Sequence, residues 1–89
     1  MIKIAWGRVF GTSYKKRVKS DDELKKRFWD IMETFSRNPF TPFLLTRKLT
    51  GKLEGLQAIS VTNDYRVIFK SLDKYEVLLI DIGGDDEVY

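Results

Sequence analysis

One amphipathic helix, predicted over about residues 20–38, constrains the fold of this chain more than any other feature of the sequence. Its apolar residues recur at i, i+4, i+7, i+8 and i+11 and would form one stripe: Leu24, Phe28, Ile31, Met32 and Phe35. Ser20 and Glu23 have the spacing of a capping box, which predicts that the helix starts at Ser20. Pro39 cannot continue a helix, so the helix should end near Asn38. A helix with a single apolar stripe needs a second apolar layer to pack against.

The rest of the chain predicts four strands and one shorter helix. Apolar residues alternate with others over about residues 2–6, which is the period of a half-buried strand. Apolar residues four positions apart then predict a short helix over about residues 10–19. Three further strands are expected later in the chain, at about residues 56–61, 65–72 and 75–82. Asp73 and Lys74 join the last two strands in a turn short enough for a hairpin.

This order of elements predicts an α+β fold. In chain order the elements are strand, helix, helix, strand, strand and strand, which suggests a twisted, mostly antiparallel four-stranded sheet with both helices on one face. A chain of 89 residues can build one hydrophobic core, so residues 1–89 should form a single domain. The connector at residues 38–43 contains two prolines, and its two phenylalanines are expected to be buried.

The composition excludes several kinds of site. The chain has no cysteine and no histidine, so thiolate and imidazole ligands are absent and a structural zinc site is excluded. No segment approaches the ~18 apolar residues that a membrane-spanning helix needs. Basic residues scattered through residues 1–20 interrupt any signal-peptide core. We therefore expect a cytoplasmic protein with no membrane partner, no metal and no cofactor.

Charge is distributed unevenly along the chain. Residues 1–52 contain thirteen Lys or Arg against five Asp or Glu, whereas residues 53–89 contain three against eight. Such asymmetry suggests a basic face that contacts a polyanion, because neutralising phosphates releases counterions. A solvated helix surface without a ligand explains the charge pattern equally well. The candidates for a basic face are the cations of the two helices: Lys15, Lys16, Arg17, Lys25, Lys26 and Arg27.

A family resemblance is carried by short motifs that occur in order along most of the chain: Tyr14-Lys15-Lys16, the exit of the long helix at Pro39, Lys48-Leu49-x-Gly51-x-Leu53-x-Gly55, Asp64-Tyr65-Arg66-Val67-Ile68-Phe69, Leu79-Ile80-Asp81-Ile82-Gly83 and Asp86-Glu87-Val88-Tyr89. Each motif alone is weak. Their order and spacing, in a chain of this length, resemble the RelE/ParE superfamily of bacterial toxins, and most closely its YafQ-like branch, whose members cleave messenger RNA. The resemblance implies a compact RelE-like fold, which the periodicities support independently.

The resemblance also implies a function. It implies the toxin of a type II toxin–antitoxin system, neutralised by a cognate antitoxin protein. Active relatives cleave mRNA in the A site of the 30S ribosomal subunit without a metal, so mRNA and ribosomal RNA are the implied nucleic-acid partners. In this reaction the 2′-hydroxyl attacks the neighbouring phosphorus and leaves a 2′,3′-cyclic phosphate. The chemistry needs a general base, cations that stabilise the phosphate charge, and a proton donor.

Carried over onto this sequence, the resemblance implies four catalytic residues: Asp64, Arg66, Asp85 and Tyr89. Either aspartate would be the base, the arginine would stabilise phosphate charge, and the terminal tyrosine would stack on a nucleobase or position the substrate. The implied RNA- and phosphate-binding residues are all basic: Arg47, Lys48, Lys52, Lys15, Lys16, Lys25 and Lys26. Three positions that hold histidine in relatives differ here: Arg47, Ser60 and Asp85.

Simpler alternatives are open at each catalytic position. Arg66 could be an outward-facing strand residue and Asp64 an ordinary turn residue. Asp85 could belong to a solvated tail, and Tyr89 could fray as the terminal residue. Two other functions are open because the sequence lacks histidine. One is a non-nuclease toxin that acts on a protein target, as ParE-type relatives do, and the other is a catalytically weakened homologue that keeps antitoxin binding.

Overall fold

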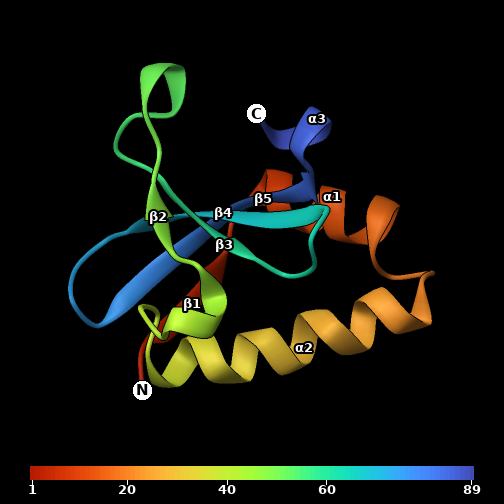
Figure 1. Cartoon of the computed structure of the whole chain (residues 1–89), viewed down its shortest axis with the longest axis horizontal. Coiled ribbons are helices and arrows are strands. Elements are labelled where there is room, and N and C mark those ends of the chain that lie inside the picture. Colours follow the sequence, from red (N-terminus) through yellow and green to blue (C-terminus); the bar gives the residue numbers. More distant parts are fainter.

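The computed structural model describes all 89 residues and packs helices against a single sheet (Figure 1). The strands are β1 (Lys3–Trp6), β2 (Arg47–Lys48), β3 (Gln57–Ser60), β4 (Tyr65–Ser71) and β5 (Glu76–Gly84). The helices are α1 (Arg8–Arg17), α2 (Asp22–Arg37) and α3 (Asp85–Val88), with short 3₁₀ turns η1 (Pro42–Leu44) and η2 (Gly51–Leu53). None of the helices is long and apolar enough to cross a membrane.

The sheet has five strands in the order β1-β5-β4-β3-β2. β1 runs parallel to β5, and every other neighbouring pair is antiparallel. The predicted α+β fold with a mostly antiparallel sheet is therefore confirmed, but the predicted count of four strands misses β2. That strand consists of Arg47 and Lys48, which pair with Ala58 and Gln57 of β3. A strand of two residues is too short to show an alternating pattern in the sequence.

One hydrophobic core joins both helices to one face of the sheet. α2 contributes the whole predicted stripe from Leu24 to Phe35, and α1 contributes Phe10 and Tyr14. The sheet contributes alternate residues of its three long strands: Ile59, Val67, Phe69, Val77, Leu79 and Ile82. Both helices thus pack on the same face, as predicted. The opposite face carries Ala58 and Ile68, which are buried but do not belong to this core.

The predicted start of α2 is wrong by one residue. Asp21 rather than Ser20 caps the helix, and its Oδ1 accepts a hydrogen bond from the backbone N–H of Leu24 at 3.1 Å. The backbone N–H of Asp21 donates to the Val18 carbonyl at 3.0 Å, so a tight turn out of α1 brings the aspartate to the capping position. The predicted end at Asn38 is correct.

α1 lies against the part of β5 that continues beyond its pairing with β1. The backbone N–H of Gly7 donates to the Leu79 carbonyl at 2.9 Å, and the helix begins at the next residue, two positions before the predicted start. At the other end of α1, Arg17 Nη1 donates to the Ile82 carbonyl at 2.8 Å. The helix therefore satisfies polar backbone groups on a strand edge that would otherwise be open to pairing.

Gly7 and Gly11 should respond in opposite ways to the same substitution. A Cβ added at Gly7 would lie 2.8 Å from the Leu79 carbonyl oxygen, a backbone atom held in the sheet. Gly7→Ala should therefore lower the free energy of unfolding by about 1–3 kcal/mol. A Cβ added at Gly11, inside α1, would meet no atom within 4 Å, and Gly11→Ala should raise the free energy of unfolding by about 0.5–1 kcal/mol. Urea denaturation measures both changes, and a shift of the same sign in the two variants would contradict the close contact at Gly7.

Candidate functional site

A cationic cleft lies between the loop that carries η2 and the C-terminus. Its volume is about 460 Å³, and its lining combines three basic residues and a tyrosine with no carboxylate: Arg47, Lys48, Leu49, Thr50, Lys52, Leu53 and Tyr89. Figure 1 shows the green η2 loop and the blue α3 at the same end of the molecule. Two segments that are far apart in the sequence therefore build one site.

Arg47 connects the two sides of the cationic cleft. Its Nη2 donates to Tyr89 Oη at 2.9 Å, and its Nη1 donates to the Leu45 carbonyl at 3.0 Å. These two bonds orient the guanidinium group, while the side chain of Tyr89 stays 52% exposed. Gly51 adopts a φ of 68°, a left-handed conformation that glycine tolerates, and it turns the chain so that Lys52 returns to the cleft.

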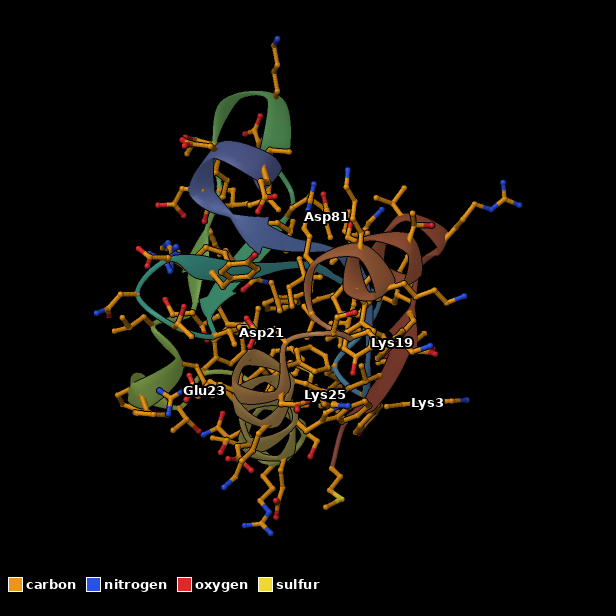
Figure 2. All side chains as sticks on the ribbon, turned by 90° about the vertical axis from the view of Figure 1, so that its right-hand side faces the viewer. Lys3, Lys19, Asp21, Glu23, Lys25 and Asp81 are labelled. Carbon is orange, nitrogen blue, oxygen red and sulfur yellow. The ribbon has the colours of Figure 1, made fainter.

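α3, which precedes Tyr89, is attached to the body of the protein by an ion-pair network. The backbone N–H of Gly84 donates to Glu87 Oε1 at 2.7 Å, and Glu87 Oε2 lies 3.1 Å from Arg17 Nε. Arg17 Nη1 also lies 3.6 Å from Asp81 Oδ1, and Figure 2 shows Asp81 on β5 beside α1. Neither α3 nor this network was predicted from the sequence. The network anchors α3, the helix that directly precedes Tyr89.

Arg66 does not line the cationic cleft. Its Nη1 donates to the carbonyls of Thr62 at 2.8 Å and Tyr65 at 3.2 Å, and its Nε lies 3.5 Å from Asp85 Oδ1. The side chain is only 15% exposed, and the Nε atom is buried without a hydrogen-bond partner. Arg66 therefore lies on the sheet face opposite to the core residue Val67, with its guanidinium group covered by its partners. Arg66 pairs with Asp85, the first residue of α3, whereas Arg47 bonds to Tyr89, which directly follows α3.

The two predicted bases lie in a separate acidic hollow. This hollow has a volume of about 420 Å³ and is lined almost entirely by carboxylates: Asp64, Gly84, Asp85, Asp86 and Glu87. Asp85 pairs with Arg66 and Glu87 with Arg17, whereas Asp64 has no ion-pair partner. A concentration of negative charge repels a phosphate group. The structure therefore brings neither Asp64 nor Asp85 into the cationic cleft, and Asp85 pairs with Arg66 outside it.

Comparisons with known proteins find likeness in structure rather than in sequence. No protein-family model matches the chain, and no curated protein matches it. A metal-bound toxin from Helicobacter pylori superposes with a TM-score of 0.79 at 19% identity, with 100% of both chains covered. A YoeB/ParE toxin from Agrobacterium tumefaciens gives 0.77 at 18% identity over 93% of this chain and 98% of that one. YafQ from E. coli strain BL21(DE3) gives 0.76 at 18% identity over 100% and 99%.

This chain has the RelE/ParE toxin fold. The resemblance inferred from the sequence motifs is thus confirmed at the level of the fold. Within this RelE/ParE fold, the cationic cleft lies where the β2–η2 segment meets the residue that follows α3. No group of three or more acidic side chains is arranged to hold a metal ion.

The predicted RNA-binding lysines of the helices lie outside the cationic cleft. Lys15, Lys16 and Lys26 are exposed and Lys25 is half-buried, and none of them belongs to its lining. Figure 2 shows Lys25 on α2, at the opposite end of the RelE/ParE fold from α3. A short RNA segment seated in the cleft would not reach this end of the molecule. Contacts between these lysines and a larger RNA stay a prediction.

Two arginines assigned to the same basic face have internal partners instead. Arg17 belongs to the network that attaches α3. Arg27 Nε donates to the Val61 carbonyl at 2.9 Å, and its guanidinium carbon lies 5.3 Å from the centre of the Phe43 ring. The sequence reasoning missed both roles, because contacts between side chains and distant backbone atoms leave no local pattern.

The connector after α2 also differs from its prediction. Phe40 and Phe43 were expected to be buried, but their side chains are 63% and 60% exposed. Leu44, which is fully buried, fills the core position from this connector. The prediction is wrong because the buried side chain of Leu44 alone fills the core beneath this connector. The two phenylalanine rings are left at the surface.

Proposed function

We propose that this chain is the toxin of a type II toxin–antitoxin pair, and that it cleaves mRNA in the ribosomal A site as a metal-independent endoribonuclease. The observation that carries the proposal is the cationic cleft, in which Arg47 is bonded to the exposed Tyr89 at 2.9 Å. The RelE/ParE fold supports the proposal, because the proteins that share it here are toxins. Because bacterial ribosomes are cytoplasmic, the proposed activity is cytoplasmic as well.

The cleft suits a phosphodiester that is flanked by an unpaired base. Guanidinium groups bind phosphate oxygens with two parallel hydrogen bonds, and Lys48 and Lys52 add two further positive charges at the same lining. The exposed ring of Tyr89 offers a surface on which a nucleobase can stack. A duplex would not expose a base in this way. Single-stranded RNA is therefore the substrate that these groups fit best.

Cleavage would follow the usual in-line route for RNA. The substrate's own 2′-hydroxyl loses its proton to a base and attacks phosphorus, the bond to the 5′-oxygen breaks, and that oxygen takes up a proton. The products are a 2′,3′-cyclic phosphate and a 5′-hydroxyl end. Asp85 is the candidate base; it lies outside the cleft, paired with Arg66 at 3.5 Å, and would have to turn toward the bound phosphodiester to act. The hydroxyl of Tyr89 is the candidate proton donor, and the cations stabilise the charge that develops on the phosphate.

A cognate antitoxin is the proposed protein partner. A heterotetrameric YoeB–YefM toxin–antitoxin complex from Staphylococcus aureus matches this chain with a TM-score of 0.71 at 16% identity, over 91% of this chain and 93% of that chain. We infer a similar neutralising partner here. Such a protein would have to offer carboxylates to the cationic cleft, because burying several cations without partners is costly.

Induced expression in bacteria tests the proposed function. Growth should stop within minutes of induction, and mapping of RNA ends should show cleavage at fixed positions within codons, with 2′,3′-cyclic phosphate ends. Co-expression of the cognate antitoxin should restore growth. Arrest of growth with intact mRNA would overturn the nuclease assignment, and the absence of any arrest would overturn the assignment as an active toxin.

A charge-matched pair of variants locates RNA binding. Removing both lysines of the cleft in Lys48→Gln/Lys52→Gln should flatten the slope of log K against log salt concentration by about 1.4, because each cation lost from a single-strand contact contributes about 0.7. The control is Lys3→Gln/Lys19→Gln, which removes the same charge from two exposed lysines outside the cleft. Figure 2 shows both control lysines at the right-hand side of the view, away from the blue α3 at the top left. Equal slopes for the two double variants would contradict binding at the cleft.

A second candidate function is favoured by one observation. Arg66 is already paired with Asp85, and the chain has no histidine to serve as a second proton-transfer group. A toxin with such a site could act on a protein target, as a non-nuclease member of the same fold, or could be a weakened homologue that still binds its antitoxin. DNA damage with intact mRNA after induction would favour the protein target. Antitoxin binding without growth arrest would favour the weakened homologue.

A further inference from the structure

A third hollow, distinct from the cationic cleft and the acidic hollow, shares only Arg66 with the groups invoked above. It has a volume of about 270 Å³ and is formed by the η1 turn, the β3–β4 turn and side chains of α2 and β4. Its principal lining residues combine two arginines with apolar and hydroxyl side chains: Arg27, Phe43, Leu45, Ser60, Thr62 and Arg66. Figure 1 shows the yellow-green η1 turn at the end of β2 opposite to the η2 loop.

Phe43 forms a fixed aromatic surface at this hollow. The guanidinium carbon of Arg27 lies over the ring at 5.3 Å from its centre, and Arg27 is itself held by the bond from its Nε to the Val61 carbonyl at 2.9 Å. The cation therefore packs against one face of the Phe43 ring. The side chain of Phe43 is nevertheless 60% exposed. A ring that is held in place but left open can accept a flat, apolar ligand.

Leu45 provides a second, independent sign of function at the same hollow. It has a φ of 52° and a ψ of 42°, a left-handed conformation that is unfavourable for a leucine. Its backbone is held there by a bond from its N–H to the Pro42 carbonyl at 3.1 Å and by the Arg47 bond to its own carbonyl. The side chain is 64% exposed, so it contributes little to the core. Glycine or asparagine would fit this backbone better, so the apolar side chain serves something other than stability.

The charges around the hollow indicate the kind of ligand. The lining contains two guanidinium groups and no carboxylate. Arg27 also lines a neighbouring hollow, where it shares the lining with the carboxylates of Asp21, Glu23 and Asp64. Asp85 is the one carboxylate that reaches Arg66, at 3.5 Å, and it approaches from α3. A ligand for this hollow should therefore combine a flat apolar surface with negative charge, as a nucleotide does.

Arg47 links this hollow to the cationic cleft. Its Nη1 bonds the carbonyl of Leu45, which lines the hollow, and its Nη2 bonds Tyr89, which lines the cleft. We propose that the hollow is a second nucleotide subsite, in which Phe43 stacks on the base of a single-stranded RNA whose adjoining phosphodiester occupies the cationic cleft. Arg66 and Arg27 supply positive charge near the phosphate of that nucleotide. This inference rests on the proposed function and extends it by one nucleotide.

The test uses the full chain and a 2′-O-methyl RNA oligonucleotide, which lacks the hydroxyl that would attack the phosphate. A 2-aminopurine base in the oligonucleotide reports stacking by loss of its fluorescence. Phe43→Ala should weaken binding by about 5- to 100-fold and abolish the loss of fluorescence, while Phe43→Trp should preserve both. Phe40→Ala is the matched control, because Phe40 belongs to the same connector and is 63% exposed. Its affinity should stay within about twofold of the wild type, since it does not line the hollow.

Leu45→Asn separates binding from folding. Asparagine tolerates the left-handed backbone, so the melting temperature should not fall, yet the apolar contact with the base is lost and affinity should decrease.

Equal affinities for Phe43→Ala and Phe40→Ala would overturn the second subsite. If the Lys48→Gln/Lys52→Gln variant nevertheless binds RNA more weakly than the wild type, RNA binding at the cationic cleft is retained and only the second subsite is lost. A wild-type chain that binds no RNA would overturn both, and a loss of antitoxin binding rather than RNA binding in Phe43→Ala would assign the hollow to the protein partner.

Discussion

Replacing Arg66 with glutamine is expected to slow RNA cleavage by about 10²–10³-fold, the usual cost of removing one fixed group that stabilises transition-state charge. The expectation follows from how firmly this guanidinium is held. Its Nη1 bonds two backbone carbonyls at 2.8 and 3.2 Å, and it is only 15% exposed, so it needs little reorganisation when charge develops nearby. Single-turnover cleavage of a ribosome-bound mRNA measures the change.

Two further variants test whether the effect belongs to the guanidinium group. Arg66→Lys keeps the charge but cannot form two parallel bonds to a phosphate, so it should recover only part of the rate. Lys70→Gln removes an exposed cation from the same strand, β4, and should leave the rate within about twofold. A rate for Arg66→Gln close to that of Lys70→Gln would show that Arg66 serves the fold through Asp85 and not the reaction.

Replacing Phe28 with alanine is expected to lower the free energy of unfolding by about 3–5 kcal/mol. Phe28 is fully buried at the centre of an aromatic cluster that joins α2 to α1. Its ring centre lies 5.9 Å from that of Phe10, 5.4 Å from Tyr14 and 5.2 Å from Trp29. Truncation removes apolar contacts on several sides at once and leaves a cavity that the rigid neighbouring rings cannot fill.

Phe40→Ala is the matched control for this loss of stability. It deletes the same side chain from a position that is 63% exposed, so the free energy of unfolding should change by less than about 0.5 kcal/mol. Urea denaturation followed by tryptophan fluorescence measures both variants, since Trp29 contacts Phe28 directly. Similar losses in the two variants would contradict the central place of Phe28 in the core.

The elements were predictable because their signals are local. The stripe from Leu24 to Phe35 is buried as predicted, and Asn38 ends the helix as Pro39 requires. The errors lie where local signals compete or are missing. Ser20 and Asp21 can both cap a helix, and the turn from α1 selects the aspartate.

The candidate site was predictable only in part. Arg47, Lys48, Lys52 and Tyr89 were named from the family resemblance, and all four line one cleft. Asp64 was named in the same way but lies in the acidic hollow. The resemblance assigns positions along the chain, whereas the surroundings of a side chain depend on segments from elsewhere in the fold.

The sequence by itself determined the fold class, the two long helices α1 and α2 and the strands other than β2, because periodicity, caps and turn residues act over a few neighbouring positions. Tertiary structure alone decided which charges share a hollow. Arg47 and Tyr89 are 42 positions apart, and Arg17 and Asp81 come from opposite ends of the chain. Strand order and the path of the loops bring these groups within bonding distance, and electrostatic interactions depend on distance in space rather than on separation along the chain.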